Sequence, residues 1–369
     1  MNKLIWFVFP SFSLFRVAVS SFGSVSDFPT IFVGQEKGVL EEVSFSSMIQ
    51  YQYAGVHSDQ GDGDDASFRR FRVGLKARSL GLLRFSSNLN LKTDRGLSYK
   101  NLSTAYIVYS PYGSDKSSAK SFCISVGKLK PRFSHEYAIH ASKIKTLERS
   151  LLVNQLAPAK ATGMTVAGEL ESFSYSVGCY SGDDADEFST FGSEGTVFIL
   201  KVQKPFKESL DLAIDYMVAS FGQEITAGIQ HAVSFSSVYN GNYESGFLSC
   251  QTDFLFSDSE SPGGNAIGLI LLPSVKHTER VESVLRYQLS ASSAEQGLNL
   301  QNRYEQLPDG VTAGGSGNFY QAAYLGLNYH LKDNAFKVMS GLEYACMDGG
   351  LTGQDYDGWT WASGLRMYF

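Results

Sequence analysis

Long apolar runs are missing from this sequence of 369 residues. No stretch of about 18 uncharged apolar residues occurs, which argues against membrane-spanning helices. Proline is scarce, with 9 residues, and the 4 cysteines lie far apart without a CxxC pair. Neither a zinc site nor a dense disulfide framework is therefore indicated. The chain offers instead 36 glycines, 20 tyrosines and 26 phenylalanines, which suits an all-β protein with tight turns.

Enzyme signatures are missing as well. The 6 histidines show no HExxH motif, and no GxSxG, Walker or GxGxxG motif is present. No sequence pattern identifies a Ser and His pair on the barrel wall, of the kind that barrel hydrolases use. The acidic run Asp59–Asp65 lacks the spacing and closing glutamate of a calcium loop, so a solvated outer loop is the better interpretation. We expect no enzyme activity, no catalytic residue, no metal and no cofactor.

Residues 68–92 carry two consecutive polar and apolar alternations. Arginines, lysines and other polar residues take the even positions from Arg70 onward, whereas odd positions such as Phe71 and Leu75 are apolar. Successive side chains of a strand point to opposite faces, so this is a hairpin with one apolar and one cationic face. A basic block could suggest nucleic-acid binding, but its strict alternation with apolar residues argues against that partner.

Strand-like runs follow one another from residue 41 to the end of the chain. Repeated alternation of this kind is typical of a transmembrane barrel with a water-filled interior. We find about 17 such runs, of which residues 298–307 are the weakest. Because single-chain bacterial barrels normally have an even number of strands, we predict a transmembrane antiparallel β-barrel of about 16 strands.

The N-terminus has the features of a secretory signal. An apolar run from Leu4 to Phe15 follows a lysine and precedes a small-residue site at Ala18–Ser20. Arg16 interrupts this pattern, and a buried N-terminal strand is the alternative interpretation. The predicted organisation is a signal peptide over residues 1–23, a linker over 24–40 and a single barrel domain over 41–369.

One long connection between predicted strands lacks the polar and apolar alternation. Residues 131–161 show no alternation, and a loop of this length without its own strand is usually functional. Residues 144–155 within it could form a short helix. If the 131–161 loop folds into the barrel, it narrows the pore and lines it with positive charge. An external loop with solvated charges is the alternative.

Positive charge is concentrated between residues 68 and 160, which hold 18 Lys and Arg residues against 4 acidic ones. Fixed positive charge in a narrow wet space favours anions, and arginine adds a planar fork for phosphate or carboxylate oxygens. Pairing with acids across the pore is the alternative role. The candidate pore-lining, anion-attracting residues lie on predicted strands or in the 131–161 loop. They are Arg70, Arg72, Lys76, Arg78, Arg84, Lys128, Lys130, Arg132, Lys143, Lys145, Arg149 and Lys160.

The last strand alternates up to the final residue. Trp359, Trp361 and Leu365 share one face, Thr360 is on the other, and the chain ends at Phe369. A terminal aromatic after an alternating strand resembles the C-terminal signal of bacterial outer-membrane barrels. This resemblance implies recognition by the barrel-assembly machinery and insertion into the outer-membrane lipid bilayer.

Four segments in order resemble the phosphate-selective porin O and P family. They are Arg69–Gly74, Val126–Tyr137, Leu147–Leu151 and Gly163–Val166. The resemblance covers about residues 68–181. It implies a 16-stranded, homotrimeric porin of the bacterial outer membrane, exported through the periplasm, with an inward-folded constriction loop and an anion-favouring pore.

The expected function is passive diffusion of small anionic solutes, phosphate among them, through this channel. Two alternatives stay open, because the C-terminal half is acidic: a general porin for neutral or cationic solutes, and a non-conducting structural or adhesive barrel. Conductance and its reversal potential distinguish them.

Overall fold

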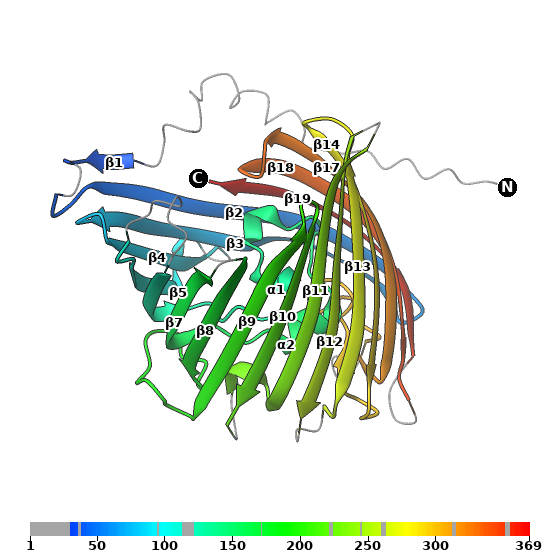
Figure 1. The fold of residues 1–369 in the computed structure, drawn as a ribbon. Helices are drawn as coiled ribbons and strands as arrows, with labels where there is room; N and C mark the ends of the chain where they lie inside the picture. The colour runs from blue at the N-terminus through cyan, green and yellow to red at the C-terminus, as the bar shows by residue number, and fades with distance from the viewer. Residues whose placement is uncertain are drawn as a thin grey trace.

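Figure 1 shows the fold of the chain in a computed structural model. The structure describes residues 30–35, 38–93, 96–112, 122–170, 172–220, 224–243, 246–259, 263–311, 315–350 and 355–369. The predicted signal peptide lies outside the described residues, as does part of the predicted linker.

The larger of two sheets in the described residues has 17 antiparallel strands, of which β1 lies outside the closed ring and 16 form the barrel. The barrel strands are β2 (Glu42–Ser58), β3 (Gly61–Ser79), β4 (Leu83–Lys92), β5 (Ser98–Tyr109), β6 (Phe122–Leu129), β7 (Ala161–Leu170), β8 (Phe173–Ser181), β9 (Thr196–Lys207), β10 (Leu210–Ala219), β11 (Ile229–Tyr243), β12 (Gly246–Ser259), β13 (Ala266–Lys276), β14 (Val281–Ser292), β17 (Phe319–Lys332), β18 (Phe336–Asp348) and β19 (Tyr356–Tyr368). Each pairs with the barrel strand that precedes or follows it in the chain, so β14 pairs with β17. The ring closes where β19 pairs with β2, from Gly358 opposite Ser58 to Tyr368 opposite Met48.

The predicted barrel is thus confirmed, and the weakest predicted run is not one of its strands. Residues 298–307 contain only β15 (Leu298–Asn299), which pairs with β16 (Ser316–Gly317) in a separate two-stranded sheet. The acidic run Asp59–Asp65 was expected to be a loop, and this is wrong for most of it. The β2–β3 hairpin turns at residues 59 and 60, and the remaining acids are exposed residues of β3.

The segment predicted as a linker contains a short strand, β1 (Thr30–Val33). It pairs with the start of β2, where Thr30 lies opposite Ser44 and Val33 opposite Glu42. β2 begins at Glu42, but its pairing with β19 reaches only to Met48, so the first residues of β2 lie beyond the end of β19. β1 therefore covers an edge of β2 that β19 is too short to reach.

Inner and outer faces alternate as the sequence predicts. In β19 the inward Arg366 is 3% exposed, whereas the outward Trp359 is 50% exposed. Outward positions of other strands are apolar and exposed, for example Leu325 and Leu342. No helix among the described residues is both long and apolar enough to cross a membrane.

Residues 130–160, which connect β6 to β7, are called the lumen loop here. They contain α1 (His135–Ala138), a 3-10 turn η2 (Ala141–Lys143) and α2 (Leu151–Leu156), and Figure 1 shows both helices within the ring of strands. The backbone N–H groups of His135 and Glu136 bond to Asp253 of β12, while Gln50 of β2 bonds to the carbonyl of Ala141. Contacts with distant parts of the ring place the loop in the interior, which confirms the predicted inward fold.

The core of the protein lies between the lumen loop and the barrel wall. Phe133, Leu151 and Leu152 are each 1% exposed and belong to the same apolar cluster as Leu255 and Ile270 from the inner faces of β12 and β13. Burying each such side chain contributes roughly 1.5–3 kcal/mol relative to exposure. Packing therefore fixes the C-terminal half of the lumen loop, and α2 occupies part of the region predicted to be helical.

Candidate functional site: the lumen loop and the cationic wall

The lumen loop is tied to β3 by a buried ion pair. Arg69 donates to Glu148 through Nε and through Nη2, which lies 2.5 Å from Oε2, and both side chains are 3% exposed. Burial alone raises the pKa of Glu148, but the charge and hydrogen bonds of Arg69 outweigh it and lower that pKa to about 2. Glu148 is thus a carboxylate at neutral pH.

A β-bulge brings Arg69 into the lumen. Gln50 of β2 lies opposite Arg70, and the next residue, Tyr51, lies opposite Phe68, so Arg69 is the extra residue of β3. Nη1 of Arg69 and Nη1 of Arg70 both donate to Oε1 of Gln50, at 3.0 and 2.9 Å. Strict alternation would have placed Arg69 on the lipid face. Arg69 is therefore not among the lumen residues predicted from the sequence.

Three cations from the last strands hold the backbone of the lumen loop. Nη1 of Arg286 in β14 donates to the carbonyl of Glu148 at 2.7 Å, and Nζ of Lys337 in β18 donates to that of Ile144 at 2.7 Å. Arg366 of β19 donates to the carbonyl of Leu147. None of these three cations is among the predicted pore-lining residues, because they belong to the acidic half of the chain.

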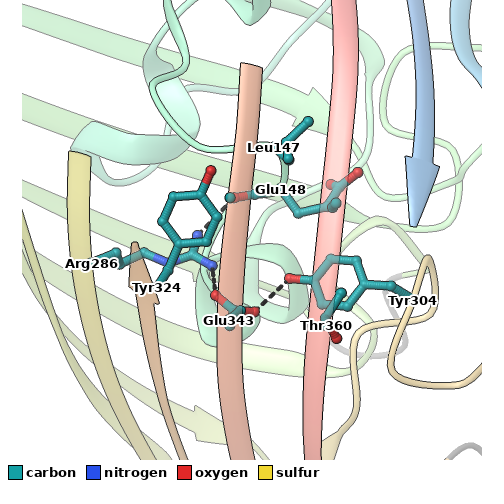
Figure 2. Close-up of a pocket in the computed structure, with 9 residues that line it drawn as sticks. Leu147, Glu148, Arg286, Tyr304, Tyr324, Glu343 and Thr360 are labelled. Atoms are coloured by element: carbon teal, nitrogen blue, oxygen red, sulfur yellow. Dashed lines mark hydrogen bonds and ion pairs between the residues drawn. The ribbon is translucent and has the colours of Figure 1, made fainter. Parts of the chain in front are cut away.

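Arg286 is also part of a compact polar cluster, shown in Figure 2. Its Nη2 lies 2.5 Å from Oε2 of Glu343, and the hydroxyl of Tyr304 donates to Oε1 of Glu343 at 2.8 Å. Tyr304 comes from the connection between β14 and β17, whereas Glu343 comes from β18. A wall strand, the lumen loop and a second connection therefore meet at one buried site.

Five of the predicted pore-lining cations bond to acids or to backbone. One is Lys130, which donates to the carbonyl of Tyr137, and the remaining four are Arg78, Lys145, Arg149 and Lys128. Arg78 lies 3.1 Å from both Glu41 and Glu42, and Lys145 lies 3.4 Å from Glu282. Arg149 and Lys128 donate to carbonyl oxygens: Arg149 to those of Glu136 and Ile139, Lys128 to that of Ala185. The charges of these four side chains are partly compensated, and Arg149 and Lys128 serve to position loops.

Besides Arg149 and Lys128, eight predicted cations, Lys130 among them, have no carboxylate oxygen within 4.0 Å in the part of the chain that the structure describes. They are Arg70, Arg72, Lys76, Arg84, Lys130, Arg132, Lys143 and Lys160. Their partners are neutral, as in the 2.6 Å bond from Arg72 to Asn90 and the 3.1 Å bond from Lys76 to the Tyr368 hydroxyl. Arg132 and Lys143 are exposed residues of the lumen loop. Positive charge therefore remains uncompensated along β3 and the lumen loop.

Arg70, Arg72, Lys130 and Lys160 are called the cationic cluster here. The two lysines stand at the two ends of the lumen loop. Burial and then the charges of Arg72 and Arg70 lower the pKa of Lys160 to about 6. Burial and then the charges of Arg149, Arg70 and Lys160 lower the pKa of Lys130 to about 5. The loop ends and β3 thus bring four cations together, and at neutral pH the arginines carry most of the charge.

Comparison with protein families matches residues 43–197 to the family described as phosphate-selective porin O and P. The match includes the β2–β3 hairpin, the lumen loop and the strands up to the start of β9. It confirms the resemblance predicted from the sequence over this range. No curated protein matches the chain.

Solved structures with the same fold are outer-membrane proteins. An anion-selective porin from Comamonas acidovorans has a TM-score of 0.59 and 14% identity, covering 89% of this chain and 99% of that chain. OmpT, an outer membrane protein of Vibrio cholerae, has a TM-score of 0.55 and 12% identity, covering 92% of this chain and 100% of that chain. OccAB4 of Acinetobacter baumannii has a TM-score of 0.53 and 12% identity, covering 89% and 98%. At this identity the similarity concerns the fold.

Proposed function

We propose that this bacterial outer-membrane porin, similar to the phosphate-selective porin O and P family over residues 43–197, forms a water-filled channel for passive diffusion of small anions, phosphate among them. The observation that carries the proposal is the cationic cluster. Arg70 and Arg72 lie on the inner face of β3, beside both ends of a loop folded into the lumen.

The contacts of the cationic cluster favour the passage of anions over their tight binding. Arg72 is held by Asn90 and Arg70 by Gln50, so both guanidiniums are oriented by neutral partners and keep their charge. Fixed cations on the barrel wall raise the local concentration of anions. Sites that do not surround an anion bind it weakly enough to release it again. Guanidinium groups present a planar fork that matches phosphate oxygens.

The experiment is conductance of the purified protein in planar bilayers, with the reversal potential measured under a salt gradient. We expect anions to cross faster than cations at low salt, with the preference fading as salt screens the wall charges. Adding inorganic phosphate should reduce the chloride current if the two ions share the same sites. Cation preference at low salt would contradict the proposal, and an absence of conductance would support a structural or adhesive barrel.

Three further parts of the proposal follow from family resemblance or from sequence. The mature chain begins after the signal at residues 1–23, the protein assembles as a homotrimer, and the barrel-assembly machinery recognises its C-terminal strand. N-terminal sequencing of protein from outer membranes, and its mass in mild detergent before and after heating, test the first two. Deleting Phe369 should reduce the amount of inserted barrel.

A further inference from the structure

Residues 298–311, in the connection between β14 and β17, also fold into the barrel, and we call them the second lumen segment. Leu298 and Glu305 are 0% exposed, and Tyr304 is 4% exposed. Tyr304 belongs to an apolar cluster with Ala54 of β2 and Met339 of β18, both inward residues. Glu305 accepts a 2.6 Å hydrogen bond from the hydroxyl of Tyr320 in β17. The segment is therefore packed inside the barrel.

The second lumen segment holds the lumen loop directly. Nε2 of Gln301 donates to the carbonyl of Arg149 at 2.8 Å, and Oε1 of Gln301 accepts from Nδ2 of Asn154 at 3.0 Å. Nε2 of Gln155 donates to the carbonyl of Gly297 at 3.3 Å. One glutamine thus bonds to both the turn before α2 and the helix itself, so the two segments form one unit.

This unit brings one more cation to the lumen. Nε of Arg303 lies 3.4 Å from Oε1 of Glu148, the carboxylate already paired with Arg69. One carboxylate faces two guanidiniums, so one positive charge is left over. The Arg303 side chain is 44% exposed, whereas that of Glu148 is 3% exposed. The surplus charge therefore faces open space, and Arg303 acts electrostatically on Arg72 of the cationic cluster.

We infer that Arg303 is a selectivity-determining cation of the pore, carried there by the second lumen segment. The inference rests on the proposed anion channel and adds to it a residue far from the basic block of the sequence. The passage for small anions is then bounded by β3, by the lumen loop and by this segment.

Charge reversal tests the selectivity role. We expect Arg303→Glu to lower the anion-to-cation permeability ratio by about twofold or more at low salt, because it changes the local charge by two units. Arg280→Glu, at an exposed position in the β13–β14 connection at the opposite rim, is the matched control with the same charge change and should leave the ratio unchanged. Heat-dependent migration on gels verifies that each variant forms a barrel. An unchanged ratio in Arg303→Glu would overturn the inference, provided that the wild-type channel prefers anions.

Thiol labelling tests the location separately from the proposed function. Arg303→Cys should react with a membrane-impermeant anionic thiol reagent and lose conductance on reaction, with the native cysteines measured on the unsubstituted protein. Tyr304→Cys, at the adjacent buried position, should react far more slowly. Equal rates at the two positions would remove Arg303 from the pore. Fast labelling of a channel without anion preference would instead contradict the proposed function and leave the location intact.

Discussion

Arg69 and Glu148 form a two-point ion pair in which both side chains are 3% exposed. One residue comes from the first hairpin of the barrel and the other from the lumen loop, 79 residues further along the chain. The pair determines where the loop meets the wall. Its geometry uses the fork of arginine, which a lysine would not reproduce.

Removing one partner of this pair should destabilise the barrel. Arg69→Met leaves the buried Glu148 carboxylate with the partly exposed Arg303, 3.4 Å away, as its remaining ion-pair partner, and removing one partner of a buried pair costs up to about 3–5 kcal/mol. We expect a lower unfolding temperature, measured by heat-dependent gel migration, and noisier single-channel currents. The double variant Arg69→Met with Glu148→Met should be closer to wild type, because both charges are gone. Equal losses in the single and double variants would argue against the pair as the anchor.

Two arginines of β3 should differ in their effect on selectivity, although they share one face. Arg72 bonds to a neutral asparagine, whereas Arg78 lies 3.1 Å from Glu41 and from Glu42. Arg72→Gln should therefore reduce anion preference in reversal-potential measurements, and Arg78→Gln should change it little. The assignment would be wrong if Arg78→Gln had the larger effect.

A cation on the lipid face should impair insertion according to its depth. Leu325, in the middle of β17, is 58% exposed, and Leu325→Arg should cost roughly 2–4 kcal/mol near the bilayer midplane. Leu75 is also outward, but it pairs with Phe45, beyond the last contact of β2 with β19. Leu75→Arg should cost only about 0–1 kcal/mol. The insertion of both variants is measured as the yield of heat-modifiable barrel in outer membranes. Equal yields would contradict the different membrane depths assigned to Leu325 and Leu75.

Anion preference should decrease as pH rises through mildly acidic values. Burial and neighbouring cations favour the neutral forms of Lys130 and Lys160, with pKa values of about 5 and 6. Both lysines are charged below these values and neutral above them, whereas an ordinary lysine stays charged up to about pH 10. Reversal potentials measured from about pH 4 to about pH 8 should show the decrease. The variant with Lys130→Met and Lys160→Met should show a flatter profile, and an equally steep one would assign the titration to other groups.

Much of the barrel follows from side-chain periodicity alone. The alternation of the last strand predicts correctly that Trp359 and Thr360 lie on opposite faces, since Trp359 is 50% exposed and Thr360 is 4% exposed. The inward fold of the loop between β6 and β7 was one of two interpretations of the sequence. A long segment without a strand period is usually functional, but an external loop with solvated charges has the same pattern.

Local irregularities and distant contacts were not predictable from the same patterns. Arg69 reaches the lumen through a bulge, which appears in the sequence only as two adjacent arginines between Phe68 and Phe71. The register of the partner strand is needed to assign both arginines to the lumen. Lys337 and Arg366 were not selected because local charge counts assign their region to the acidic half. Arg303 lies in the weakest predicted run, where a loop packed inside a barrel has no period of its own to identify it.

The order in which the loop and its partners occur along the chain has a consequence for assembly. The lumen loop precedes β7, but the groups that hold its carbonyls, Arg286, Lys337 and Arg366, come from β14, β18 and β19. Until the C-terminal strand has joined β2, Arg366 is not in place and the carbonyl of Leu147 has no cation to bond. Closure of the barrel and final positioning of the lumen loop therefore occur in the same step. In a barrel that has not closed, the width of the pore is not yet fixed.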